Sequence, residues 1–196
     1  MKNIFKNTAL VLSLMAFFSL SLTSCNRSDD ETDDLPQEEL SDVLLIVTDQ
    51  ADGAAETYDY QVNGSQNPII KLEDGHTYNV EAKFMNGDEN VTQEILDAKD
   101  EHFLVYDFPN SDITLTRTDG ASSTRADGNH VGLFTKWVVN KAVKNTAATS
   151  TQLKLTLYHE PKTVAETSSA SGNGLVYGQQ SGGETDAQAF YNIANK

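Results

Sequence analysis

The stretch Tyr78-Asn-Val-Glu-Ala-Lys-Phe84 alternates apolar and polar residues, and this pattern decides the fold class. Successive side chains of a β-strand point to opposite faces, so the alternation predicts a strand with one buried face. The stretch Leu153-Lys-Leu-Thr-Leu157 repeats the pattern later in the chain. Both stretches therefore predict half-buried strands that pack against a core.

Outward from these two stretches, further short segments have the same period of two. They lie near residues 43–47, 58–62, 70–72, 103–105, 113–115, 131–137 and 185–193. Turn-forming Asp-Gly or Asn-Gly pairs lie between the segments, at 52–53, 63–64, 74–75, 86–87, 119–120 and 127–128. Eight or nine short strands at this spacing predict an all-β protein. We expect an antiparallel immunoglobulin-like β-sandwich that forms a single domain over residues 43–196.

Two segments depart from the period of two. Residues 90–102 carry apolar residues at helical spacing, which predicts one short helix. Asn90 is the predicted N-cap, and Gln93, three residues on, can bond back to it as in a capping box. Residues 163–183 are rich in Ser, Gly, Thr and Gln, which predicts a long mobile loop before the last strand.

Residues 1–24 have the parts of a lipoprotein signal peptide. Lys2 and Lys6 form a basic start, and an apolar run too short for a comfortable transmembrane helix follows at residues 9–22. The run ends in Leu22-Thr-Ser-Cys25, which resembles a lipobox. We therefore expect cleavage before Cys25, the single cysteine, and a covalent lipid anchor on its thiol. The alternative is an ordinary signal peptide followed by an incidental cysteine.

Residues 25–42 are predicted to form a disordered acidic tether. Eight of the 17 residues from 26 to 42 are acidic and almost none is apolar, so the segment cannot bury enough surface to offset chain entropy. Its start, Ser28-Asp-Asp-Glu31, resembles the acidic export signal of surface lipoproteins in Bacteroidota, which implies display on the outer face of the outer membrane. A solvated linker is the plainer alternative.

The chain is strongly acidic, with 14 basic and 29 acidic residues and a net charge of −15. Loss of Lys2 and Lys6 with the signal peptide leaves 12 basic against 29 acidic residues, a net charge of −17. Such a surface repels nucleic acid and anionic lipid, and it tolerates cations and basic partner surfaces. We therefore expect no nucleic-acid partner, and contact with the membrane through the lipid anchor.

The sequence contains no nucleophile elbow, P-loop, dinucleotide fingerprint or His-Glu-x-x-His pair, so we do not expect this protein to be an enzyme.

Turn residues at 119–120 and 127–129 offer oxygen ligands for calcium, but the ordered ligand series of an EF-hand is missing and turn chemistry explains these residues.

Two histidines beside carboxylates are the candidate metal ligands: His102 follows Glu101, and His159 precedes Glu160. Imidazole with carboxylates suits zinc or copper, and two histidines with Glu101 or Glu160 would make a tetrahedral site. Two structural alternatives stay open. His159 continues the apolar face of its strand and can cap the core, while His102 can cap the C-terminus of the predicted helix.

Five short sequence motifs, taken in order, carry a resemblance to a known family. They are Asn90-Val-Thr-Gln-Glu-Ile95, Asp100-Glu-His-Phe-Leu-Val-Tyr106, Asp127-Gly-Asn-His-Val-Gly-Leu133, Leu155-Thr-Leu-Tyr-His-Glu-Pro-Lys162 and Gly182-Gly-Glu-Thr-Asp186. In this order and spacing they resemble a family of small Bacteroidota outer-membrane lipoproteins, described as hypothetical or as type 1 periplasmic binding domain-containing proteins. The resemblance covers about residues 40–193.

The resemblance implies a location near TonB-dependent outer-membrane receptors, with no reaction assigned. The family phrases match this chain at Asp100, Glu101, His102, His159, Pro161 and Lys162. His130 stands where the family phrase usually has a proline, so we do not expect His130 to be a ligand. The doubly wound α/β fold that the family description implies disagrees with the many short strands predicted here.

Two functions follow as hypotheses. The first is a surface-anchored accessory lipoprotein that binds a nutrient, such as a metal ion or its complex, and passes it to a TonB-dependent receptor. The second is a structural or adhesive surface module that contacts protein or glycan. A glycan site needs an exposed aromatic residue, and Trp137 is the main candidate, although its place in the run from 131 to 139 favours the core.

Overall fold

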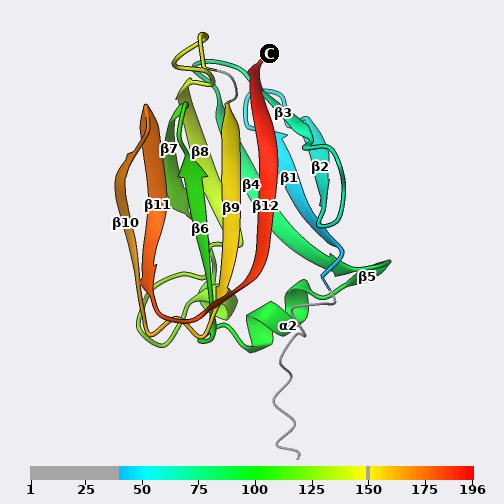
Figure 1. Ribbon diagram of the computed structural model, residues 1–196, viewed down its shortest axis with the longest axis vertical. Coiled ribbons are helices and arrows are strands. Elements are labelled where there is room, and N and C mark those ends of the chain that lie inside the picture. The colour runs from blue at the N-terminus through cyan, green and yellow to red at the C-terminus, as the bar shows by residue number, and fades with distance from the viewer. Residues whose placement is uncertain (1–39, 149–150) are drawn as a thin grey trace, which may run out of the picture. The chain divides into compact units, whose positions relative to one another are not determined.

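The computed structural model describes residues 40–148 and 151–196, which belong to one compact unit (Figure 1). The predicted signal peptide, Cys25 and nearly all of the predicted tether lie outside the described residues. Within the described part, no helix has the length and apolar character needed to cross a membrane. Leu40 falls within the predicted tether but is buried in the core, so the packed domain starts slightly earlier than residue 43.

Twelve strands, one short α-helix and one 3-10 turn make up the described fold. The strands are β1 (Asp42–Asp49), β2 (Ala55–Gln61), β3 (Ile69–Leu72), β4 (Thr77–Asn86), β5 (Glu89–Asn90), β6 (His102–Phe108), β7 (Asp112–Arg117), β8 (Phe134–Lys141), β9 (Gln152–His159), β10 (Thr163–Ser171), β11 (Gly174–Ser181) and β12 (Glu184–Asn195). The helix is α2 (Thr92–Asp97), and the 3-10 turn is η1 (Ala121–Ser123).

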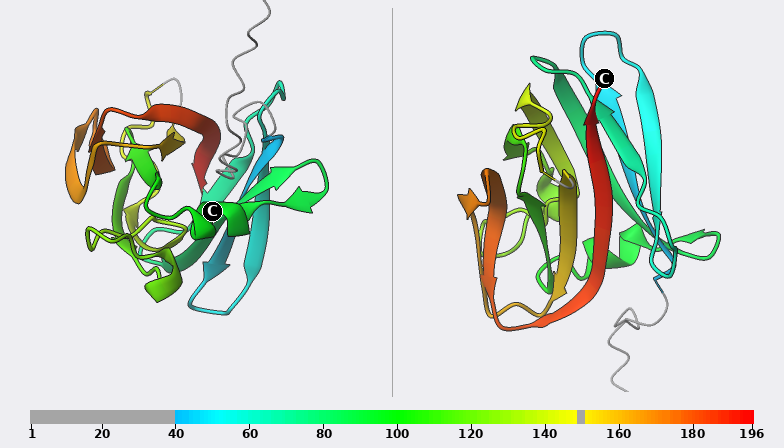
Figure 2. Two further views of the ribbon diagram at one scale, coloured as in Figure 1. Left: turned by 90° about the horizontal axis from the view of Figure 1, so that it is seen from below. Right: turned by 45° about the horizontal axis from the view of Figure 1, so that its top comes forward.

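The strands form two six-stranded sheets that pack face to face (Figure 2). Sheet A has the order β2-β1-β4-β8-β7, with β5 paired to β4, and sheet B has the order β10-β11-β6-β9-β12-β3. This arrangement confirms the predicted all-β sandwich. The immunoglobulin-like detail is not confirmed, because such domains have seven to nine strands in antiparallel sheets. Here twelve strands include one parallel pair, β12 with β3.

The alternation in the sequence builds the core between the sheets. In β4 burial follows the alternation of the sequence. Tyr78, Val80, Ala82 and Phe84 are buried, and the residues between them face outward. Trp137 of β8 is fully buried, and its ring packs edge-on against Phe108 of β6 with centroids 5.2 Å apart. Large interlocking aromatic rings therefore fill the centre of the sandwich.

Two tyrosine hydroxyls of sheet B donate hydrogen bonds directly to backbone carbonyl oxygens of sheet A. Tyr191 of β12 donates to the carbonyl oxygen of Val43 in β1 (2.6 Å), and Tyr177 of β11 donates to the carbonyl oxygen of Ile113 in β7 (2.6 Å). Each bond satisfies a phenol inside the core and fixes how one sheet lies on the other.

The prediction of a mobile loop over residues 163–183 is wrong, because β10 and β11 form a hairpin there. The hairpin extends sheet B, since β11 pairs with β6 in the register Leu175 opposite Phe108. The strand β10 carries mostly Ser, Thr and Ala and lies at the sheet edge, with little apolar alternation to reveal it. Backbone pairing with β11, rather than burial of apolar side chains, makes this segment a strand.

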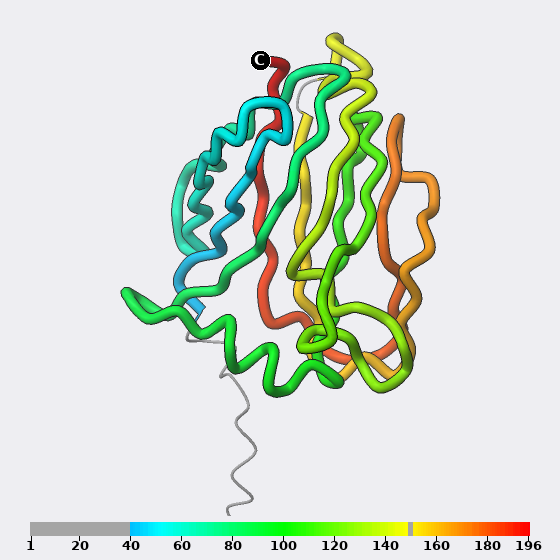
Figure 3. Tube along the Cα trace, turned by 180° about the vertical axis from the view of Figure 1, so that it is seen from behind, coloured from blue at the N-terminus to red at the C-terminus, as the bar shows by residue number. Residues whose placement is uncertain are grey.

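The predicted helix is confirmed but is shorter than residues 90–102. The helix α2 ends at Asp97, and His102 begins β6 instead of closing the helix. Val91 occupies the N-cap position, while the Asn90 side chain accepts a hydrogen bond from the backbone of Thr92 (3.0 Å), so the predicted capping box does not form. The helix connects β5 of sheet A to β6 of sheet B, crossing one end of the sandwich (Figure 3).

Candidate functional site

The two predicted metal ligands meet at the end of the sandwich where α2 lies. His102 opens β6 and His159 closes β9, and the two residues are direct register partners in this antiparallel pair. Their imidazole rings stack with centroids 5.1 Å apart and an interplanar angle of 11°. The structure therefore brings His102 and His159 together, which sequence spacing could not establish.

A third strand adds a carboxylate that the sequence reasoning missed. Asp186 of β12 places Oδ2 3.4 Å from His102 Nε2 and Oδ1 3.7 Å from His159 Nδ1. The side chains of Asp186 and His102 are 4% and 3% exposed. The buried carboxylate thus faces one ring nitrogen of each imidazole.

The two predicted glutamate ligands contribute differently. Glu101 Oε2 lies 3.7 Å from His159 Nε2, so Glu101 belongs to the cluster. Glu160 is exposed and has a positive φ of 47°. It contacts the cluster only through its backbone N–H, which donates to the Glu101 carbonyl oxygen (2.6 Å). The structure therefore unites three of the four predicted ligands and adds Asp186.

The cluster does not have the geometry of a zinc or copper centre. His102 Nδ1 lies 2.9 Å from the carbonyl oxygen of Ala98, which occupies one ring nitrogen. The rings lie face to face, so their nitrogens do not converge on one point as tetrahedral ligands must. Across the described residues, no group of three or more His, Cys, Asp or Glu side chains is placed to hold a metal ion. The metal expectation for this site is therefore not supported.

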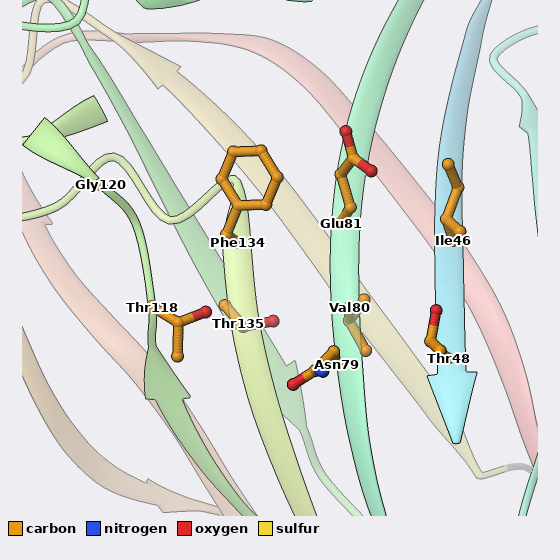
Figure 4. Close-up of a pocket in the computed structure, with 9 residues that line it drawn as sticks. All are labelled: Ile46, Thr48, Asn79, Val80, Glu81, Thr118, Gly120, Phe134 and Thr135. Atoms are coloured by element: carbon orange, nitrogen blue, oxygen red, sulfur yellow. The ribbon is translucent and has the colours of Figure 1, made fainter. Parts of the chain in front are cut away.

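A second candidate site lies on the outer face of sheet A, where a groove of about 550 Å³ opens to solvent (Figure 4). Its lining comes from β1, β4, β8 and the segment after β7: Ile46, Thr48, Asn79, Val80, Glu81, Thr118, Gly120, Phe134 and Thr135. We call this site the outer groove. Its volume falls within the range of about 300–1,000 Å³ that is usual for small-molecule sites.

Strand register builds the outer groove in rows. Phe134 lies opposite Glu81, and Glu81 lies opposite Ile46, so these three side chains form one row across β8, β4 and β1. Two residues along the same face, Asn79 lies opposite Thr48 and begins the next row. Apolar and hydrogen-bonding side chains therefore alternate over one continuous surface.

The position of Phe134 is fixed by the segment that precedes β8. Asp119 Oδ1 accepts hydrogen bonds from the backbone N–H groups of Gly132 (3.1 Å) and Leu133 (2.9 Å). The N–H of Thr118 donates to the Phe134 carbonyl oxygen (2.8 Å). Burial raises the pKa of Asp119, and the two backbone donors oppose that rise. The chain therefore enters β8 along one defined path.

Buried Arg117 supports the same segment from inside the sandwich. Its guanidinium donates to the carbonyl oxygens of Val131 (2.8 Å) and Leu104, and it lies 4.3 Å from the ring centroid of Phe103. Burial lowers the pKa of Arg117. A buried cation held by carbonyl dipoles and an aromatic face links β6 to the segment that carries Phe134.

A smaller hollow of about 260 Å³ adjoins the outer groove toward α2. The two hollows share Glu81 and Phe134, and α2 contributes Thr92, Gln93 and Leu96 to the smaller one. Phe134 is 38% exposed at the boundary, whereas Trp137, the aromatic candidate from the sequence, is fully buried. The two residues lie three positions apart in β8 and so face opposite sides of the sheet.

No protein-family profile, no curated protein and no solved structure matches this chain.

Proposed function

We propose that this chain is a non-enzymatic binding lipoprotein that takes its ligand in the outer groove. The observation that carries the proposal is the row of Phe134, Glu81 and Ile46, which puts an exposed aromatic ring beside a carboxylate in a 550 Å³ groove. A concave site with apolar walls and a few polar groups is the usual form of a ligand site. The site sits on paired strands, so binding needs little ordering of the protein.

In this proposal the protein works at the cell surface. Cleavage before Cys25 and lipid on its thiol hold it on the outer membrane, and the acidic tether lets the domain reach a TonB-dependent receptor. The motivating features are the lipobox-like Leu22-Thr-Ser-Cys25 and the acidic residues that follow. The ligand is an organic nutrient rather than a free metal ion, since the histidine cluster lacks converging ligands.

Nuclear magnetic resonance tests the site without assuming a ligand. The mature chain from residue 25, with Cys25→Ser, is titrated with a library of small organic compounds. We expect shifted backbone amides at Phe134, Glu81 and Asn79. Amides on the outer face of sheet B, such as those of Lys154 and Gln188, are the internal control. Amide shifts confined to sheet B, or no amide shifts at the outer groove with any compound, would contradict the proposal.

The anchor and the partner are tested separately. Wild-type protein should sediment with outer membranes and be labelled by surface reagents on intact cells, while Cys25→Ser should be released. Cross-linking of the wild-type protein should recover a TonB-dependent receptor, identified by mass spectrometry. Release of the wild-type protein from membranes would contradict the anchor, and recovery without any such receptor would contradict the partner.

An adhesive function is the second candidate, and one observation favours it. The strand β10 lies at the edge of sheet B with mostly small polar side chains, and such an edge can pair with another chain. Ala170→Pro removes one backbone N–H that faces away from β11, and it should then weaken adhesion and leave ligand shifts in the outer groove unchanged.

A further inference from the structure

We infer that the outer groove binds a neutral oligosaccharide, with Phe134 stacking on the apolar face of one sugar ring and Glu81 and Asn79 bonding its hydroxyl groups. The inference rests on the proposed function and names the ligand class of the same site. A pyranose ring presents C–H groups on one face and hydroxyls around its edge, so its site needs an exposed aromatic face beside donors and acceptors.

Phe134 supplies the aromatic face. Among the described residues, three large apolar side chains are exposed, and Phe134 is the aromatic one beside the aliphatic Ile69 and Leu175. The hydrogen bonds from Thr118 and to Asp119 hold its strand in place, so the ring needs little ordering on binding. Covering the ring removes its exposed apolar surface from water, which favours binding.

The polar neighbours suit hydroxyl groups. Asn79 Oδ1 accepts a hydrogen bond from Gln50 Nε2 (2.7 Å), which fixes the orientation of the Asn79 amide. Glu81 adds an acceptor directly opposite Phe134, and the hydroxyls of Thr48 and Thr118 can donate or accept. This mixture of donors and acceptors matches a polyhydroxylated ligand better than a purely apolar one.

The charge of the site favours a neutral ligand. Glu81 Oε1 lies 3.4 Å from Lys83 Nζ, and both side chains are partly exposed, so the carboxylate is locally balanced. The whole chain carries a net charge of −15, which repels sulfated or uronic-acid polymers at long range. A neutral saccharide avoids this electrostatic repulsion and does not compete for the Glu81–Lys83 ion pair.

The adjoining hollow indicates a ligand longer than one sugar ring. The 550 Å³ groove and the 260 Å³ hollow meet at Phe134 and Glu81, and the smaller one adds Asn90 and Gln93 as amide groups. A chain of sugars that crosses Phe134 would place neighbouring rings in the two hollows. Oligosaccharides should therefore bind more tightly than the corresponding monosaccharides.

Calorimetry with the intact lipidated protein in lipid nanodiscs tests the inference, since glycosidic detergents would compete. A panel of neutral oligosaccharides and their monosaccharides is titrated. For the panel member that binds best, Phe134→Ala should weaken binding at least about tenfold, and Phe134→Trp should preserve it. The matched control is Leu175→Ala, because Leu175 is 37% exposed on β11 and should leave affinity unchanged.

The outcomes separate the inference from the proposed function. No binding by any neutral oligosaccharide, or equal losses in Phe134→Ala and Leu175→Ala, overturns the saccharide inference. If amide shifts still map another compound to the outer groove, the proposed function stands without it. If Phe134→Ala instead converts a dimer into a monomer in sedimentation, the groove is an interface between copies of this chain, and the inference is overturned.

Discussion

His102 and His159 stack face to face across the β6–β9 pair, with ring centroids 5.1 Å apart. The buried carboxylate of Asp186 bridges the two rings from β12, at 3.4 Å and 3.7 Å. Three strands and the turn after α2 therefore meet at one polar cluster at the end of the sandwich where α2 lies.

Loss of the Asp186 carboxylate should destabilise the fold. Asp186→Ala leaves His102 Nε2 buried without its acidic neighbour, and we expect a loss of about 1–3 kcal/mol in the free energy of unfolding, measured by urea denaturation. Glu184→Ala is the matched control, because Glu184 is exposed in the same strand and should cost little. Equal losses in the two variants would contradict a structural role for the cluster.

Zinc and copper should not bind to the histidine pair. The stacked rings and the Ala98 contact give no converging ligand set, so equilibrium dialysis should detect no binding tighter than about millimolar that depends on the histidines. Weak binding elsewhere on the acidic chain should be unchanged in His102→Ala and in His159→Ala. A tight site that either substitution abolishes would restore the metal hypothesis.

The pH dependence of stability should reveal the Asp49–His76 pair, whose Oδ2 and Nδ1 atoms lie 2.8 Å apart. The hydrogen bond with Asp49 raises the pKa of His76 above 6.5, so this stabilisation is complete below about pH 6.5 and is lost as the pH rises through the higher folded-state value. The Tm should therefore fall as the pH rises above about 6.5. The fall should be smaller in His76→Gln.

The same pair acts in the opposite sense at low pH. The N–H of Ala51 and then His76 lower the pKa of Asp49, so that stabilisation is present above about pH 3.8 and is lost as the pH falls through the lower folded-state value. Asp49→Asn should flatten the profile at both ends. Profiles that run parallel to the wild type would show that the pair contributes nothing.

Gly132 should be far less tolerant of substitution than Gly128. Both have positive φ angles, 98° and 86°, but a Cβ at Gly132 would collide with the Arg117 guanidinium, while a Cβ at Gly128 meets open space. Gly128→Ala should cost about 1–2 kcal/mol from the backbone conformation. Gly132→Ala should cost about 1–3 kcal/mol more because of the collision, as measured by thermal unfolding. Equal costs would mean that Arg117 moves away freely.

The local pattern of residues is sufficient to predict the strands that bury one apolar face. In β4 and β9 the alternation of residues such as Val80, Phe84 and Leu155 decides both the strand and its buried side, because a residue cannot change faces without a shift of register. The sequence pattern also predicts one short helix. The pattern does not reveal β10, whose Ser and Thr residues form a strand through pairing with β11.

The candidate sites depended on the tertiary structure. Alternation puts Phe134 and Trp137 on opposite faces of β8, but the packing of sheet B decides that Trp137 is buried and Phe134 is exposed. Likewise, His102, His159 and Asp186 meet because of the registers of β6, β9 and β12, strands far apart in the chain. Local pattern fixes which way a side chain points, whereas its neighbours come from long-range pairing that no short stretch of sequence encodes.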